Sequence, residues 1–370
     1  MILALVLLLA SLTANPCASL KSMEGTDGPP GNLDDGPHVY WRNDTTAVVF
    51  SFIGGRLVQE TFTASDTVRF QGSLDGTAVS FAIPTIGPSR VACDTGAVPR
   101  FLAVSDVHGD FPHFREILLA SGVMDDSFRW TWGEGHLVVL GDIMDRGPAV
   151  TECLWLVYLL AQQAERAGGA VHFVLGNHEL MVLLGDLRYV HERYLDGISG
   201  VTGMDCDDLF GPDMELGRWI RSRPAVVRMG DILFVHGGIA PGSGVDELSL
   251  PEINELVWRG LERSSVGYLL DGVERVFGSL GPLWFRGYHY GMEGLYLETT
   301  AEEVAILLDR YEVERIVVGH TEHDSLAVLF GGRVVAIDVP VDCIGGQQAL
   351  LREASAFYRV NADGSRVLIP

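Results

Sequence analysis

Five short clusters of polar residues each follow a run of apolar, β-favouring residues. The clusters are Asp106 and His108 in SDVHGD, Asp142, Asp145 and Arg146 in GDIMDRG, Asn177, His178 and Glu179 in GNHE, His236 in HGG, and His320 in VGHT. A single His or Asp-Arg pair after a strand is usually structural. Five such clusters, each flanked by glycine, indicate one shared site.

The residue types of these clusters suit a metal centre. Carboxylate, imidazole and amide oxygen ligands together fit Mn, Fe or Zn. Two such ions about 3.5–4 Å apart can hold both the attacking and the leaving oxygen of an in-line displacement. The expected ligands are Asp106 and His108 for one ion, Asn177, His236 and His320 for the other, and Asp142 as the bridge between them.

The segments that carry these clusters alternate between strand-like and helix-like patterns. The apolar runs are FLAVSD, HLVVLGD, VHFVLGN, ILFVHGG and RIVVGH, and the expected helices between them are Phe111–Ser121, Val150–Ala167, Glu179–Asp186 and Ala301–Tyr311. Strands buried on both faces and alternating with helices predict an α/β domain, here residues 99–345. The carboxyl ends of such strands form the edge where ligands bind.

The chain on either side of this domain has a different composition. Residues 21–37 are rich in Gly, Pro and Asp and are typical of a linker. Residues 38–98 contain short β-favouring runs separated by turn residues, which predicts a small all-β module. Residues 346–370 are expected to form a C-terminal strand or extension.

Acidic residues outnumber basic ones, with 49 Asp and Glu against 26 Lys and Arg and a formal net charge of −23. A protein that holds nucleic acid through its phosphates needs the opposite balance, so we expect no nucleic-acid partner. The same charge repels anionic substrates at long range. A phosphate site must therefore have local positive charge, from metals or arginines.

The first 12 residues are almost wholly apolar and are followed by TANPC. This run is too short to span a bilayer and resembles a secretory signal, so we expect residues 1–20 to be a signal peptide. An extracytoplasmic location, periplasmic or secreted, follows from that reading. The alternative is a misassigned start or a buried N-terminal helix. Beyond this segment no membrane span is expected, because no other apolar run approaches about 18 residues.

The five cysteines are Cys17, Cys93, Cys153, Cys206 and Cys343. None belongs to a CxxC motif, which argues against a thiolate zinc site. Cys153 lies in an apolar run and is expected to be a buried thiol.

The clusters resemble the motifs of the PPP-type metallophosphatases, within the calcineurin-like phosphoesterase superfamily. GDIMDRG, GNHE and HGG match the family pattern, whereas SDVHG departs at its first position, where Ser105 replaces Gly. The runs DGPHVYW, FVHGGI, PLWFRGY and VVGHT are most similar to the Shewanella-like branch, which carries a β-rich N-terminal extension. The resemblance spans roughly Phe101 to Asp338. It implies an α/β (α+β) fold with a central β-sandwich flanked by helices.

The resemblance also implies roles for individual residues. A metal-bridging hydroxide would attack phosphorus, with His178 as the general acid and Asp145 keeping that imidazole oriented and protonated. Arg146 would bind the phosphoryl oxygens, and Arg286 in PLWFRGY is the candidate second arginine. Glu179 would cap or orient the site, or simply start a helix. The segment 186–216 is expected to shape substrate selectivity.

These features favour a dinuclear phosphomonoester hydrolase acting on a phosphorylated protein or a small phosphomonoester. A phosphoprotein substrate would carry its phosphate on Tyr or on Ser/Thr, and the residues do not decide between them. The first alternative is a nucleotide or dinucleoside polyphosphate hydrolase on the same scaffold. The second is a non-catalytic metal-binding interaction module, against which the retention of all ligands and of the acid pair counts.

Overall fold

The computed structural model describes residues 34–98, 100–198, 204, 206–262, 272–341 and 346–370. The predicted signal peptide, residues 1–20, and most of the predicted linker lie outside these residues. Within them, no helix is long and apolar enough to cross a membrane. Three cysteines are described, Cys93, Cys153 and Cys206, and Cys93 and Cys153 are free thiols. Cys153 is fully buried, which confirms the expectation for it.

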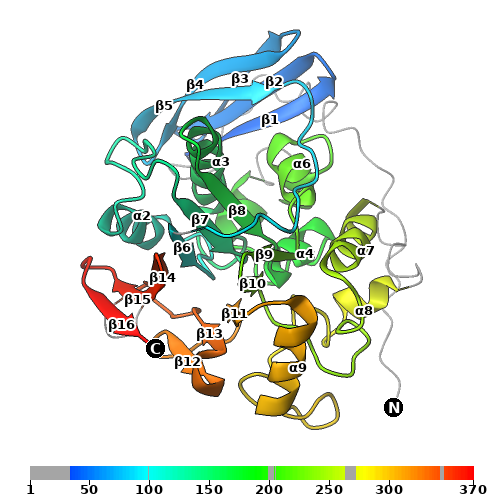
Figure 1. Ribbon diagram of the computed structural model, residues 1–370. Coiled ribbons are helices and arrows are strands. Elements are labelled where there is room, and N and C mark those ends of the chain that lie inside the picture. Colours follow the sequence, from blue (N-terminus) through cyan, green and yellow to red (C-terminus); the bar gives the residue numbers. More distant parts are fainter. Residues whose placement is uncertain (1–33, 99, 199–203, 205, 263–271, 342–345) are drawn as a thin grey trace.

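Two stacked sheets form the centre of the chain that follows the N-terminal β-strands (Figure 1). The six-stranded sheet has the order β16-β15-β14-β6-β7-β8 and the five-stranded sheet the order β12-β13-β11-β10-β9. The first consists of β6 (Arg100–Val104), β7 (His136–Leu140), β8 (Ala170–Val174), β14 (Gln348–Glu353), β15 (Ala356–Asn361) and β16 (Arg366–Ile369). The second consists of β9 (Val226–Met229), β10 (Ile232–Val235), β11 (Arg315–Val318), β12 (Ala327–Leu329) and β13 (Val334–Ala336).

The two sheets pack through alternate residues of their strands. On β6, Phe101 and Ala103 face the other sheet, and the Phe101 ring meets Phe234 of β10 edge-on at 5.3 Å between centroids. Leu102 and Val104 belong instead to the larger core that includes the helices. Burial on both faces explains the unbroken apolar run of this strand. The predicted β-sandwich is confirmed.

Helices cover the outer faces of the sandwich. They are α2 (Phe111–Ala120), α3 (Val150–Arg166), α4 (Asn177–Leu183), α6 (Glu215–Arg221), α7 (Leu250–Glu262), α8 (Val273–Phe277) and α9 (Ala301–Tyr311), with shorter turns η1 (Arg193–Ile198), η2 (Cys206–Phe210) and η4 (Phe330–Gly332). The predicted bounds of α9 are confirmed, because Thr300 and Glu303 form a capping box at its start. Helix α4 starts two residues earlier than predicted, since the Glu179 side chain accepts the N–H of Gly176 at 2.8 Å.

The N-terminal β-strands lie against α3 and α6 (Figure 1). Strands β1 (Asp35–Asn43), β2 (Thr46–Ile53) and β3 (Arg56–Thr63) form one sheet, and β4 (Thr67–Leu74) pairs with β5 (Thr77–Pro84) in another. The Trp155 indole on α3 donates to the carbonyl of Pro37 at 2.6 Å and packs on Phe81. Strand β1 begins at Asp35, inside the predicted linker of residues 21–37. The Asp35 side chain is hydrogen-bonded to His38, and both residues are buried.

The C-terminal residues complete the main sheet. Strand β14 pairs antiparallel with β6, with Leu351 opposite Leu102, and β15 and β16 continue the sheet outward. Residues 348–369 are therefore an integral part of the sandwich. The pairing was not visible in the sequence, because its two strands are separated by the whole catalytic domain.

Candidate metal centre

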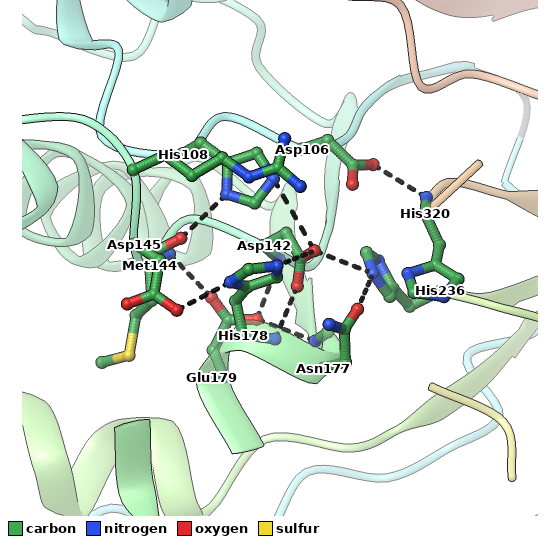
Figure 2. A network of polar contacts seen from close by, with 12 residues as sticks. Asp106, His108, Asp142, Met144, Asp145, Asn177, His178, Glu179, His236 and His320 are labelled. Carbon is green, nitrogen blue, oxygen red and sulfur yellow. Dashed lines mark hydrogen bonds and ion pairs between the residues drawn. The ribbon is translucent and has the colours of Figure 1, made fainter. Parts of the chain in front are cut away.

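The five predicted clusters meet around the carboxylate of Asp142 (Figure 2). Its Oδ2 lies 3.2 Å from Nε2 of His236, 3.8 Å from Nε2 of His108 and 3.9 Å from Nε2 of His178. The Asp142 side chain is buried, yet the three neighbouring imidazoles hold its pKa well below the usual range against the effect of burial. A single carboxylate thus faces the ring nitrogens of three clusters.

The backbone at these clusters adopts left-handed conformations that side-chain-bearing residues rarely occupy. The residues with positive φ include Asp106 (53°), His108 (47°), Asp142 (55°), Asp145 (69°), Arg146 (62°) and His320 (65°). Such conformations cost free energy and are concentrated at functional sites. Here they turn successive side chains from the strand ends toward one point.

Three of the predicted histidine ligands are oriented by backbone carbonyls. His108 Nδ1 lies 2.9 Å from the carbonyl oxygen of Met144, and His236 Nδ1 lies 2.7 Å from that of Leu140. In His320 it is Nε2 that lies 3.1 Å from the carbonyl of Trp284. Since a carbonyl only accepts, each ring donates there, and its other nitrogen is the one that can serve as a metal ligand. In His320 that nitrogen, Nδ1, lies 3.5 Å from Nη2 of Arg286.

Two groups of side chains have ligand atoms close enough to hold an ion. One contains His108, Asp142 and His178, and the other contains Asp142, His236 and His320. Asp142 is common to both, as expected of a bridging ligand. Asn177 Oδ1 lies 3.1 Å from His236 Nε2, beside the second group.

Asp106 lies beside these two groups of ligand atoms and belongs to neither. Its Oδ2 accepts the backbone N–H of His320 at 3.0 Å and the hydroxyl of Ser105. The Ser105 residue departs from the family pattern, and its single hydroxyl proton is shared between Asp106 and the carbonyl of Leu140, which lies at 3.0 Å. Its hydroxyl fixes the Asp106 carboxylate, a role that the sequence did not reveal.

His178 and Asp145 form a buried pair. His178 Nδ1 lies 2.7 Å from Oδ2 of Asp145, and its Nε2 points toward Asp142. Burial lowers the pKa of His178, but the Asp145 hydrogen bond and the Asp142 charge outweigh it, so the pKa is raised. A ring nitrogen of His178 belongs to the first ligand group, whose atoms all lie within 4.8 Å of one another. The raised pKa favours the protonated form of this imidazole.

Glu179 fastens two of the clusters together. Its carboxylate accepts the backbone N–H groups of Asp142, Ile143 and Gly176, each at 2.8 Å, and that of Met144 at 3.1 Å. Burial and the nearby Asp142 raise its pKa to about 6. Of the alternatives open for Glu179, the structure shows orientation of the site, because this side chain supports the loop that carries Asp142.

Both arginines predicted from the sequence to bind phosphate, Arg146 and Arg286, lie beside the proposed ligands. Arg146 Nη1 lies 3.3 Å from Glu322, and the Arg146 side chain is 50 % exposed. Arg286 donates to the carbonyl of His320 and to Oγ1 of Thr321, the latter at 3.2 Å. Arg221 and Arg223, at the end of α6, instead donate to nearby backbone carbonyls such as those of Gly217 and Trp219.

One acidic side chain at the site was not singled out from the sequence. Asp338 follows the apolar run VVAI, the same strand-then-carboxylate pattern that marks the other clusters. It is 5 % exposed and lines the same cavity as Asp106 and His108.

The Metallophos family of calcineurin-like phosphoesterases matches residues 99–323. The chain belongs to this family. It shares 32 % identity and a TM-score of 0.81 with the crystal structure of a cold-active protein-tyrosine phosphatase from a psychrophilic Shewanella species, covering 91 % of this chain and 99 % of that one. It is a phosphoric ester hydrolase of the Shewanella-like branch.

Two further relatives differ in how much they share. Shewanella-like protein phosphatase 2 of Arabidopsis thaliana is 30 % identical over 292 residues, covering 65 % of this chain and 71 % of its own. A symmetrical bis(5'-nucleosyl)-tetraphosphatase of Aromatoleum aromaticum is 34 % identical over 143 residues, covering only 38 % and 44 %. The phosphatases match more of the chain than the tetraphosphatase does. The alternative, a nucleotide or dinucleoside polyphosphate hydrolase, is therefore supported less well.

Proposed function

We propose that the chain hydrolyses phosphate monoesters with two divalent or transition metal ions, drawn from Mn, Fe and Zn. The observation that carries this proposal is the position of Asp142, which is shared by two groups of ligand atoms. The donor set fits, because each histidine that we assign as a ligand has its other ring nitrogen bonded to a carbonyl. The ions, when bound, activate a water and offset charge on the phosphoryl group.

The six ligands assigned from the sequence retain those roles in the proposal. The ligands are Asp106, His108, Asp142, Asn177, His236 and His320. Glu179 supports them through the backbone of the Asp142 loop. Asp142, Asn177, His236 and His320 are buried, which lowers the local dielectric around them and strengthens their attraction for a cation.

His178 protonates the leaving oxygen in this proposal. Its Nε2 faces the centre, and its Nδ1 is held by Asp145. The raised pKa favours the protonated ring in the resting site, which is the state that a general acid needs. Asp145 acts by positioning the ring and stabilising its charge.

Arg146 and Arg286 bind the phosphoryl oxygens. Arg146 is on the exposed side of the site, where it can leave Glu322 and turn to an incoming phosphate. Arg286 is anchored at the backbone of His320, next to a proposed ligand. Two guanidinium groups supply the local positive charge that an acidic protein needs to hold an anion.

The substrate that we favour is a phosphoprotein, with phosphotyrosine ahead of phosphoserine or phosphothreonine. Support for this order comes from the crystal structure of the Shewanella protein-tyrosine phosphatase, which aligns over 91 % of the chain. A dinucleoside polyphosphate is the second candidate, favoured only by a similarity to the tetraphosphatase over 38 % of the chain. A non-catalytic module is disfavoured because the sequence retains the acid pair and all six proposed ligands.

The test is hydrolysis of p-nitrophenyl phosphate by the full chain, stripped of metal and then titrated with Mn²⁺. We expect product release that depends on metal and is lost in Asp142→Asn, because the bridge serves both ions. Asp126→Asn, on an exposed side chain, is the matched control for removal of one carboxylate. A folded, metal-loaded protein that releases no product from this ester or from phosphotyrosine would contradict the proposal.

A further inference from the structure

A cavity of about 490 Å³ opens beside the proposed metal centre. Its charged lining consists of the carboxylates Asp106, Asp110, Glu322 and Asp338 with His108 and Arg146. Among these lining residues, Arg146 is the one guanidinium. We call this space the acidic cavity. Its composition is unexpected beside a site that binds an anion, because carboxylates repel phosphate.

Two of the four carboxylates already have a task. Asp106 is a proposed metal ligand, and Asp110 caps α2 by accepting the N–H of His113 at 3.2 Å and contacting its ring nitrogen at 2.8 Å. Glu322 and Asp338 remain. They come from the segments that follow β11 and β13, so both lie at the carboxyl edge of the five-stranded sheet.

Asp338 is buried in the wall of the acidic cavity. Its side chain is engaged in no hydrogen bond or ion pair with any residue in the described part of the chain, while its backbone carbonyl accepts the N–H of His323 at 3.1 Å. A buried carboxylate without a partner is costly, so a cationic or donor group entering the cavity would stabilise it. The two groups of ligand atoms that can hold a metal do not include Asp338 or Glu322.

Glu322 is paired with the arginine that we assign to the phosphate. The distance from Glu322 Oε1 to Arg146 Nη1 is 3.3 Å, and the two side chains are 58 % and 50 % exposed. An exposed pair of this kind is weak, about 0–1 kcal/mol, and exchanges readily. A phosphate bound by Arg146 would therefore release the carboxylate of Glu322.

We propose that Glu322 and Asp338 form a subsite for a cationic group that flanks the phosphate on the substrate. When the phosphate takes Arg146, Glu322 takes an ammonium or guanidinium group of the substrate, and Asp338 lines the inner end of the same space. The ion pair between Arg146 and Glu322 is thereby replaced by two, one between Arg146 and the phosphate and one between Glu322 and the cationic group. The preferred substrate is then a phosphopeptide with a basic residue next to the phosphorylated one. This inference rests on the proposed phosphomonoesterase function and narrows its substrate class.

The test compares three phosphotyrosine peptides that differ only in the residues flanking the phosphotyrosine, which are Arg, Gln or Glu. We expect kcat/KM to be at least about tenfold higher for the Arg peptide than for the Glu peptide at low salt. The ratio should shrink at about 1 M salt, where the screening length falls to about 3 Å. Equal kcat/KM for all three peptides would overturn the inference.

Variants then show which residues cause the preference for the Arg peptide over the Glu peptide. Glu322→Gln should reduce the Arg-to-Glu ratio several-fold, Glu322→Lys should reverse it, and Asp338→Asn should reduce it in a protein whose thermal melt shows that it is folded. Glu314→Gln is the matched control, since Glu314 is exposed and precedes β11 at the end opposite Glu322. A ratio unchanged in both Glu322 variants would place the preference elsewhere and overturn the inference.

Each ratio is compared with hydrolysis of p-nitrophenyl phosphate, which has no flanking residues. If the wild type fails on this ester and on all three peptides, the proposed function itself is wrong. If it hydrolyses the ester and treats the peptides alike, only the cationic subsite is wrong. The two failures are therefore distinguishable.

Discussion

The carboxylate of Glu179 accepts the backbone N–H of Asp142 at 2.8 Å. It thereby ties the helix that begins at Asn177 to the loop that carries the shared carboxylate, although the two residues are 37 positions apart in the chain. The same side chain also accepts the N–H of Ile143 at 2.8 Å. The clusters GDIMDRG and GNHE thus form one rigid unit through a residue that touches no proposed substrate.

Glu179→Gln should weaken metal binding without removing a ligand. The amide –NH₂ of glutamine would face backbone N–H donors that now meet a carboxylate oxygen, so the Asp142 loop would lose part of its support. We expect Mn²⁺ affinity to fall about 10–100-fold, as for other outer partners of metal ligands. Isothermal titration of the metal-free protein measures this. Glu165→Gln, near the exposed end of α3, is the control and should bind Mn²⁺ like the wild type.

His178→Asn should separate metal binding from turnover. The variant keeps every assigned ligand but loses the ring that we place as general acid, so kcat should fall by about 10² to 10⁴. The loss should be larger for an alkyl phosphate, whose leaving oxygen needs a proton, than for p-nitrophenyl phosphate. Near-full turnover of an alkyl phosphate by the metal-loaded variant would refute the role. The kcat of Asp145→Asn, measured in the same way, should also fall.

The site was more predictable from the sequence than the fold around it. Each ligand is among the first polar residues after an apolar run, and parallel strands bring their carboxyl ends to one edge, so residues as distant as Asp106 and His320 were expected to meet. The bounds of α9 were predictable because Thr300 and Glu303 supply a local capping signal. The site therefore rests on signals that are local in sequence.

Features that depend on long-range contacts could not be predicted in this way. An apolar run such as FLAV is buried on both faces in a single doubly covered sheet and in a sandwich alike, so the residues alone do not separate the two. The pairing of β6 with β14 leaves no local signal in either strand. Asp338 carries the local strand-then-carboxylate pattern, but its burial beside Asp106 follows from the stacking of two sheets and could not be predicted from that pattern.

Asp35 should matter for stability although it lies in a Gly- and Asp-rich stretch. Its Oδ2 lies 2.9 Å from Nη2 of Arg193, which also meets Glu152 at 3.0 Å, and the Asp35 side chain is fully buried. Removing one partner of a buried ion pair costs about 3–5 kcal/mol. We expect Asp35→Asn to lower the free energy of unfolding by about 3 kcal/mol in urea titrations, since Glu152 remains. Asp44→Asn, in the exposed turn after β1, should change it little.

The stability of the protein should fall in acid partly through His172. Burial first, then His136 and Arg223, lower the pKa of His172 to about 4, against about 6.5 in the unfolded chain. Because the folded pKa is the lower one, the folded state favours the neutral imidazole. The stability that this preference contributes is complete above pH ~6.5 and is lost as the pH falls toward 4. The shift corresponds to about 3 kcal/mol.

His172→Phe removes this titration while keeping an aromatic ring at the same place on β8. Urea titrations between pH 7 and pH 4 should therefore show a shallower loss of stability for the variant than for the wild type. His136 Nδ1 lies 2.8 Å from His172 Nε2 and loses that partner, so the variant should be less stable at pH 7. If the free energy of unfolding of the variant falls as steeply below pH 6.5 as that of the wild type, other groups cause the loss of stability in acid.

The antiparallel pairing of β14 with β6 has a consequence for how the protein is made. The strand that leads into Asp106 keeps one unpaired edge until residues 348–353 have left the ribosome. Contacts so distant in sequence form slowly, and an open apolar edge invites pairing with other chains meanwhile. The proposed metal centre is consequently completed only once residues 348–353 have been made, and the nascent chain has to be kept apart from its neighbours until then.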